Sequence, residues 1–276
     1  MSLMLNVTGA NGFIGQAILG YCDANGIAVR GFSRTPPKSL NITQVADYSE
    51  LIHIVEGEPL IHLAECSVVA QLHDDLAKQQ YDLLDKLCQG NFSKLVYASS
   101  AAIYDSCNQD IPVSSNGFVD TVYANAKRRN ESLVLNHKGG IAVRLSNVIG
   151  KGMNKDTVIP TILSQLGRDL LTVFTVKPIR DYVSVNDVAS ALTVLALSKE
   201  SGIFHIGSGV GHSVSDLIES AARLKSLPCP VIEESKPSIP NSRIVLNISD
   251  SLSRLNWRPL YTLEDALLSL MECENG

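Results

Sequence analysis

Tyr123 and Lys127 are the pair of residues with the clearest chemical signature in this chain. Their spacing of four places both side chains on one face of a helix. A lysine beside a phenol favours the phenolate, and moving a tyrosine pKa from about 10 to about 7 requires ~4 kcal/mol of differential stabilisation. A tyrosine tuned in this way can take a proton from a hydroxyl group while hydride leaves the same carbon. Ser100, which ends an apolar run before this helix, would hydrogen-bond the same oxygen.

Three glycines near the N-terminus form a second signature. Gly9, Gly12 and Gly15 follow the apolar run 3–7, and a helical pattern opens after them. A strand, a tight turn and a helix in this order offer free N–H groups and the positive end of a helix dipole to a phosphate. Gly9 would allow the turn, Gly12 would let the backbone approach a pyrophosphate, and Gly15 would let the helix pack on the strand. The alternative is a tight turn that prefers glycine for its shape alone.

The elements that position these residues follow from the apolar pattern. Strand-length apolar runs alternate with helical patterns, which indicates a doubly wound parallel sheet. Up to residue 147, we expect strands at 3–7, 27–32, 42–46, 60–64, 94–100 and 141–145, and helices at 15–25, 68–88 and 121–137. Beyond it, we expect helices at 157–167, 185–197, 213–224 and 263–273, and strands at 171–176, 179–183, 203–207, 231–232 and 244–248.

These patterns predict an α/β fold, in which a doubly wound parallel-sheet Rossmann domain carries a smaller, interleaved C-terminal substrate lobe. The dinucleotide-binding domain would comprise residues 1–147, with returns at about 181–207. The substrate-binding lobe would comprise residues 148–180 and 208–276. Residues 203–207 would join the main sheet as its seventh strand.

The end of the second strand bears on the choice of cofactor. Proteins that bind NAD usually place Asp or Glu there to hold the ribose hydroxyls, whereas this chain has Ser33 and Arg34. An arginine can pair with a 2′-phosphate and can stack on adenine, which favours NADP(H) over NAD(H). The alternatives are an exposed loop arginine, or stacking on the adenine that both cofactors share. Asp47 and Tyr48 would lie near that adenine, and the strand end at residues 63–64 would pass beneath the cofactor.

Composition narrows the class of protein. The chain has 276 residues, of which 45% are apolar and 18% charged, and its net charge of −5 argues against nucleic acid or an anionic membrane as a partner. No apolar run reaches the ~18 residues of a membrane span, and no secretion signal precedes the first strand. The six cysteines are scattered without a CxxC pair, which is typical of reduced thiols in a cytoplasmic protein. No metal site is predicted.

With these motifs the chain resembles the extended short-chain dehydrogenase/reductases, in particular the NAD(P)-dependent nucleotide-sugar epimerase/dehydratase family. The resemblance covers nearly the whole chain. Residues 8–15 look like the TGxxGxxG turn of that family, 99–104 like its serine segment, and 123–127 like its catalytic pair. Residues 144–150 and 180–183 are similar to its substrate segments, and 255–259 resemble its LGWxP signature, in which the tryptophan is structural.

The resemblance implies a role for each matching residue. Ser100, Tyr123 and Lys127 would be catalytic, and Ser100, Asn147 and Arg180 would contact the substrate. Lys127 would also anchor the nicotinamide ribose. The residues expected to bind the cofactor are Gly9, Asn11, Gly12, Phe13, Ile14, Gly15, Ser33, Arg34, Asp47, Tyr48, Leu63, Ala64, Tyr123 and Lys127.

Several positions depart from the family pattern. Ala101 and Ala102 replace the Asp-Glu pair that 4,6-dehydratases use for elimination, so dehydration is disfavoured. The Arg-Pro-x-Asp motif that grips the nucleotide ribose is missing, and residues 236–239 lie near its expected place. The chain is also shorter than typical 4-epimerases, mainly between Asn147 and Arg180.

The expected activity is therefore hydride transfer at a sugar carbon of a nucleotide sugar, by a 4-epimerase or a 4-keto reductase. Arg34 favours NADPH and hence the reductase, whereas the overall resemblance favours the epimerase. Two alternatives stay open: an NADPH-dependent reductase of a non-sugar carbonyl compound, and a non-catalytic protein that senses or binds the cofactor. Relatives often form homodimers through the helices expected at 68–88 and 121–138, although the second of these carries Lys, Arg and Glu on its outer face.

Overall fold

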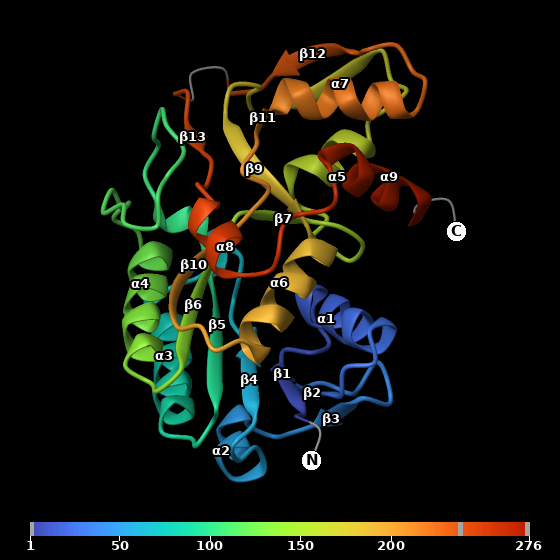
Figure 1. The fold of residues 1–276 in the computed structure, drawn as a ribbon. Coiled ribbons are helices and arrows are strands. Elements are labelled where there is room, and N and C mark those ends of the chain that lie inside the picture. Colours follow the sequence, from blue (N-terminus) through green and yellow to red (C-terminus); the bar gives the residue numbers. More distant parts are fainter. Residues whose placement is uncertain (1–2, 237–239, 274–276) are drawn as a thin grey trace.

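The computed structural model describes residues 3–236 and 240–273. Its centre is a parallel sheet of seven strands in the order β10-β6-β5-β4-β1-β2-β3 (Figure 1). These strands are β1 (Leu5–Thr8), β2 (Val29–Ser33), β3 (Ile42–Gln44), β4 (Pro59–His62), β5 (Lys94–Ser100), β6 (Gly140–Leu145) and β10 (Gly202–Ile206). The predicted α/β fold with a doubly wound parallel sheet is confirmed, and β10 joins this sheet as expected.

Helices cover both faces of the sheet (Figure 1). On one face lie α1 (Phe13–Ala24) and α6 (Val185–Leu197), which pack against each other and bury Leu5 and Val7 of β1. On the other face lie α3 (Asp74–Cys88) and α4 (Val122–Leu135). Because both faces are covered, the strands consist mainly of buried apolar residues rather than an alternating pattern.

The strand order reverses between β1 and β4, and in open parallel sheets this reversal leaves a crevice at the carboxyl ends of the strands. Thr8, His62, Ser100 and Leu145 end four neighbouring strands at this edge. The predicted site residues Gly9, Leu63 and Ser100 lie at or directly after these strand ends. The fold thus places the glycine turn, Ser100 and Asn147 along one edge of the sheet.

A second, smaller set of strands lies beyond that edge, in the upper part of Figure 1. Its central strand, β9 (Ile179–Ser184), pairs with β7 (Asn147–Ile149), β11 (Gly211–Ser213) and β13 (Arg243–Ile244), while β8 (Leu170–Val173) pairs with β12 (Val231–Glu234). Three helices pack around this group: α5 (Val158–Leu163), α7 (Val214–Leu224) and α9 (Leu263–Cys273). The short helices α2 (Leu51–Ile54) and α8 (Ser249–Arg254), with the 3₁₀ turns η1 (Tyr48–Glu50), η2 (Val69–Gln71) and η3 (Ala101–Ile103), complete the chain.

Some predicted boundaries were wrong. The helix expected at 68–88 begins at Asp74, because His73 accepts a hydrogen bond from the N–H of Leu76 and so caps it. Of the strand expected at 244–248, only Ile244 lies in a strand, β13 (Arg243–Ile244), and the helix expected at 157–167 ends at Leu163. Trp257 is buried and donates to the hydroxyl of Ser190, in keeping with the expected structural role. Residues 236–239 lie near the expected place of the missing Arg-Pro-x-Asp motif. Of these, residues 237–239 lie outside the described part of the chain.

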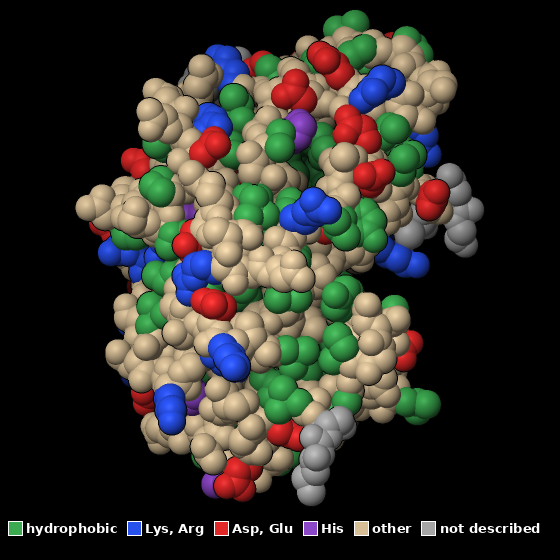
Figure 2. Space-filling model, viewed as in Figure 1, with side chains coloured by type: hydrophobic (Ala, Val, Ile, Leu, Met, Phe, Trp, Pro, Cys, Tyr) green, Lys and Arg blue, Asp and Glu red, His purple; other side chains and the backbone are tan. Residues whose placement is uncertain are grey.

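Lysine, arginine and acidic side chains are interspersed over the face of the molecule in Figure 2. Within residues 3–236 and 240–273, the helices lack the length and apolar character needed to cross a membrane. In the same ranges, the structure contains no cluster of three His, Cys, Asp or Glu side chains that could hold a metal ion.

Candidate active site

The glycine turn between β1 and α1 has the close contacts that only glycine permits. Gly9 has φ of +67°, and a Cβ there would lie 3.2 Å from the backbone of Ala64. A Cβ on Gly15 would lie 2.4 Å from the carbonyl oxygen of Gly9. Gly12 is the N-cap of α1 and supplies no side-chain cap, so the first N–H groups of the helix remain available. These features fit a cradle for a cofactor pyrophosphate.

The residues expected beside this turn are close to it. Phe13 and Ile14 begin α1, and a Cβ on Gly152 would lie in ordinary van der Waals contact with Phe13, at 3.7 Å. Leu63 and Ala64 follow β4 and run along Gly9. All four residues therefore lie at the edge of the sheet where the sequence predicts the cofactor to bind.

Asn11 organises the loop after β2. Its Nδ2 donates to Ser33 Oγ at 2.8 Å and to Thr35 Oγ1 at 2.8 Å, and its backbone oxygen accepts from Lys38 Nζ at 3.0 Å. The Ser33 hydroxyl, expected to assist a 2′-phosphate contact, is buried and already partnered by Asn11 and Thr35. Lys38 is a second cation at this loop that the sequence predictions did not include.

Arg34 is exposed, and its guanidinium lies 5.4 Å from the ring centroid of Tyr48. Tyr48 is itself buried, and its hydroxyl accepts from the N–H of Gly9 at 3.2 Å. Asp47 caps η1 through a hydrogen bond from the N–H of Ser49, and this bond lowers the pKa of its carboxyl. Arg34 is thus exposed beside the Tyr48 ring, while Tyr48 braces the glycine turn.

Tyr123 and Lys127 lie on the buried face of α4, one turn apart, as predicted. Lys127 Nζ lies 5.8 Å from the centroid of the Tyr123 ring and donates to the carbonyl oxygen of Ala98 at 3.0 Å. Ser100 ends β5, and its Oγ accepts from the N–H of Ala102 at 3.1 Å, which starts η3. Thr121 caps α4 by accepting from the N–H of Ala124, and this cap fixes where the helix begins.

Glu65 is a member of the site that the sequence predictions missed. Its side chain is 4% exposed, and its Oε2 lies 2.8 Å from Lys127 Nζ, whose own side chain is 7% exposed. The same Oε2 accepts from the hydroxyl of Tyr97 at 2.6 Å, while Oε1 accepts from Asn130 Nδ2 at 2.9 Å. Two signals could have revealed this group: an acid directly after a buried strand, and Asn130 on the Tyr123 and Lys127 face of the helix.

Charges within this group shift its pKa values strongly. Burial lowers the pKa of Lys127, but the charge and hydrogen bond of Glu65, together with the nearby Tyr97 and Tyr123, raise it by more and hold it well above the ordinary value. Burial raises the pKa of Glu65, but the charges of Lys127 and His62 and the hydrogen bonds from Lys127 and Tyr97 together outweigh that effect, so the pKa of Glu65 lies below the ordinary value. Burial and Glu65 together raise the pKa of Tyr97 well above 10. The structure therefore holds a charged Glu65–Lys127 pair beside a neutral Tyr97.

The two expected substrate residues lie in the smaller group of strands. Asn147 begins β7, is exposed, and hydrogen-bonds the phenol of Tyr182. Arg180 in β9 is half-buried and donates to the carbonyl oxygen and hydroxyl of Ser242. In the ranges that the structure describes, Arg180 takes part in no ion pair.

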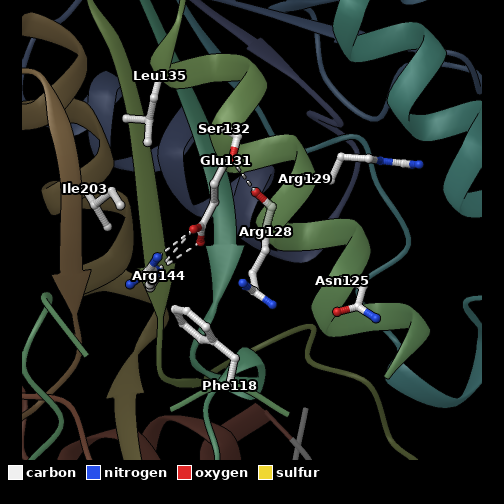
Figure 3. Close-up of a pocket in the computed structure, with 9 residues that line it drawn as sticks. All are labelled: Phe118, Asn125, Arg128, Arg129, Glu131, Ser132, Leu135, Arg144 and Ile203. Atoms are coloured by element: carbon white, nitrogen blue, oxygen red, sulfur yellow. Dashed lines mark hydrogen bonds and ion pairs between the residues drawn. The ribbon is translucent and has the colours of Figure 1, made fainter. Parts of the chain in front are cut away.

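A pocket of about 460 Å³ lies on the outer side of α4 (Figure 3). Arg144 and Glu131 form an ion pair at its base, and Arg128 lies over the ring of Phe118. Glu131 and Lys127 are buried, which corrects the expected outer face of this helix: its exposed charges are those of Arg128 and Arg129. The other residues that line the pocket are Asn125, Ser132, Leu135 and Ile203.

Comparison with known proteins finds relatives among sugar-nucleotide epimerases. A dTDP-L-rhamnose 4-epimerase of Burkholderia thailandensis is 31% identical over 131 residues, which cover 44% of this chain and 36% of that protein. An ADP-L-glycero-D-manno-heptose-6-epimerase of Cupriavidus pinatubonensis is 27% identical over 249 residues, 76% of this chain and 75% of that one.

A solved structure with the same fold is the UDP-glucose 4-epimerase of Thermus thermophilus in complex with NAD. Its TM-score is 0.83 at 22% identity, and 99% of each chain is covered. Residues 5–207 match the NAD dependent epimerase/dehydratase family, and this match spans most of the chain. The chain therefore belongs to the NAD-dependent epimerase/dehydratase family of enzymes.

Proposed function

We propose that this enzyme transfers hydride at a sugar carbon of a nucleotide sugar, as a 4-epimerase or a 4-keto reductase. The observation that carries this proposal is the placement of Tyr123 and Lys127 on one buried face of α4, next to the end of β5 where Ser100 lies. A phenol, an ammonium group and a hydroxyl in this arrangement can move one proton at a substrate hydroxyl.

The cofactor cradle fits a dinucleotide. The glycine turn and the open N-terminus of α1 would hold its pyrophosphate, with Leu63 and Ala64, which follow β4, beneath it. When bound, NAD(P) supplies a hydride acceptor and donor. Arg34 favours NADP(H), because its exposed guanidinium has a reach and charge suited to a 2′-phosphate.

The protein's own part in the reaction is to move and stabilise the proton. In an oxidation, the Tyr123 oxygen would take the proton of the substrate hydroxyl, and the Ser100 hydroxyl would hold that oxygen in place. In the reverse direction, Tyr123 would return the proton to a carbonyl oxygen. Lys127 would favour the deprotonated phenol by charge.

The substrate class rests on Arg180 and on the relatives. Arg180 is half-buried, and burial lowers its pKa, so a bound anion would relieve the cost of its desolvation. A nucleotide diphosphate provides such an anion. The relatives named above act on dTDP-, ADP- and UDP-linked sugars by name, which supports a nucleotide sugar here.

Two measurements separate the epimerase from the reductase. Purified protein is incubated with UDP-glucose, or with another nucleotide sugar from a small panel, with NAD or NADPH added. An epimerase converts the sugar to its epimer, seen by NMR, without net change in cofactor. A reductase consumes NADPH in proportion to a keto-sugar. Turnover of none of the nucleotide sugars, with turnover of a non-sugar carbonyl compound, would contradict the nucleotide-sugar proposal.

We also propose that α3 and α4 supply a homodimer face. Both helices pack together on one side of the sheet, and their exposed side chains include Lys78, Gln79, Arg128 and Arg129. Light scattering at micromolar concentration tests this directly. A dimer that Arg129→Glu converts to a monomer would support this face, and a monomeric wild-type protein would rule it out.

A further inference from the structure

Glu65 places a negative charge beside Lys127, the lysine next to the proposed proton carrier Tyr123. The chain turns sharply after β4, where the N–H of Glu65 donates to the carbonyl oxygen of Leu63 at 2.8 Å. Its side chain then enters the space between β5 and α4, and is buried against Tyr97, Lys127 and Asn130. Lys127 Nζ has three protons, of which Glu65 and the Ala98 carbonyl oxygen accept two.

A lysine that is paired with a carboxylate affects Tyr123 differently from an unpaired lysine. The ammonium group alone would favour the phenolate, whereas the Glu65 carboxylate 2.8 Å from Nζ opposes that effect. Both side chains are almost fully buried, so solvent screens the two charges weakly. The phenol therefore faces an ion pair rather than a net positive charge.

We propose that Glu65 is a built-in counter-ion of Lys127: it fixes the lysine in place and makes Tyr123 retain its proton to higher pH than an unpaired lysine would. The proposal deepens the proposed function, because it rests on Tyr123 as the proton carrier. Glu65 acts through Lys127 and is thus a positioning residue. The consequence is an enzyme in which the protonated phenol, the form that delivers a proton to a carbonyl oxygen, persists to higher pH.

The other groups around the pair do not supply a competing charge. Burial holds the pKa of His62 at about 4, so its ring is neutral near pH 7, and Tyr97 is neutral as well. The groups facing the pair are His62 from β4, Tyr97 from β5, Tyr123 and Asn130 from α4, and Cys66 from the loop after β4, which lies in the apolar cluster of Tyr123.

The test is an ultraviolet absorbance titration of tyrosinate in protein free of cofactor and substrate, for wild type and Glu65→Gln. The Tyr123→Phe form of each protein identifies the signal of Tyr123 by difference. We expect Glu65→Gln to move the Tyr123 midpoint to lower pH by about one to two pH units. If Lys127 and Tyr123 titrate as a coupled pair, the first proton to leave still leaves at lower pH, because a negative charge has been removed.

Glu58→Gln is the matched control. Glu58 precedes the other end of β4 and pairs with Arg30 in a half-exposed ion pair, so the Tyr123 midpoint should stay where it is in wild type. An unchanged or higher midpoint in Glu65→Gln would overturn the proposal. Because the titration needs no turnover, this result is independent of whether any nucleotide sugar proves to be a substrate.

Glu65→Gln leaves Lys127 buried without its partner, and this can prevent folding. In that case the double substitution Glu65→Gln/Lys127→Met tests the pairing, because it removes both buried charges. Recovery of folding in the double variant, measured by urea unfolding, supports Glu65 as the counter-ion. A double variant that folds no better than the single one would overturn the proposal, because the loss would then come from the contacts with Tyr97 and Asn130.

Discussion

Arg144 of β6 and Glu131 of α4 form a buried ion pair, with Arg144 Nη2 2.7 Å from Glu131 Oε2 and both side chains at most 5% exposed (Figure 3). Arg144 Nε also donates to Glu131 Oε1 at 3.0 Å, and the Ser99 hydroxyl donates to the same oxygen at 2.5 Å. Ser99 is the neighbour of Ser100, and Glu131 lies one turn after Lys127. Glu131 therefore ties β6, through Arg144, and β5, through Ser99, to the helix that carries the proposed proton-transfer residues.

Glu131→Gln should destabilise the protein by about 3–5 kcal/mol, because it leaves the charge of Arg144 buried without a partner. Urea unfolding at neutral pH measures this free energy. Glu264→Gln is the control: Glu264 pairs with Arg223 at the surface, so its loss should cost no more than about 1 kcal/mol. Equal losses of unfolding free energy in the two variants would contradict this prediction, because the buried ion pair would then contribute no more to stability than the exposed one.

Stability should fall as the pH drops from about 6.5 toward 4. Burial holds the pKa values of His62 and His205 at about 4, below the ordinary value of 6.5. In this window the unfolded chain binds protons that the folded protein does not, so the free energy of unfolding decreases. Each histidine contributes a loss of about 2 kcal/mol at pH 5.

His62→Leu should remove about half of that histidine-dependent loss, since His205 keeps its contacts with Tyr104 and the Asn247 carbonyl oxygen. The comparison is the difference between the free energies of unfolding at pH 7 and pH 5, for wild type and variant. A variant with the same difference as wild type would mean that His62 is not held neutral by burial.

The cofactor should be NADP(H) rather than NAD(H), by roughly 10- to 100-fold in affinity. A charge-assisted contact between Arg34 and a 2′-phosphate is worth about 1.5–3 kcal/mol, and 1.4 kcal/mol corresponds to a factor of ten. Calorimetric titration of both cofactors into wild type, Arg34→Ala and Arg30→Ala measures it. Arg34→Ala should abolish the difference, and Arg30→Ala should not, because Arg30 lies at the start of β2 and binds Glu58. Equal affinities of the wild-type protein for NADP(H) and NAD(H) would contradict this prediction and would favour an epimerase that uses NAD.

Much of the main sheet could be predicted because its signals are local. The glycine turn, the apolar strand runs and the helix that carries Tyr123 and Lys127 each depend on residues close in sequence. The crevice followed from them, since consecutive parallel strands present their carboxyl ends at one edge. For this reason the position of Ser100 at the end of β5 could be predicted without knowledge of any contact, whereas its role stays a prediction.

The parts that were not predicted depend on distant partners. β7, β11 and β13 have two or three residues each and exist through pairing with β9, which lies far from them in sequence. The Glu65–Lys127 pair joins residues 62 positions apart, and neither residue alone indicates the other. Asp74 and Asp75 at the start of α3 were a local signal for its true beginning, because acidic residues favour the first turn of a helix.

Tyr123 is the residue on which the proposed reaction depends most directly, because it would carry the proton. The decisive measurement is the turnover number of Tyr123→Phe on the nucleotide sugar that wild type converts, with Tyr81→Phe, a half-buried tyrosine of α3, as the matched control. Tyr123→Phe keeps the ring and removes the hydroxyl, so we expect turnover to fall by roughly 10²–10⁴-fold while Tyr81→Phe retains wild-type turnover. Wild-type turnover in Tyr123→Phe would contradict the account.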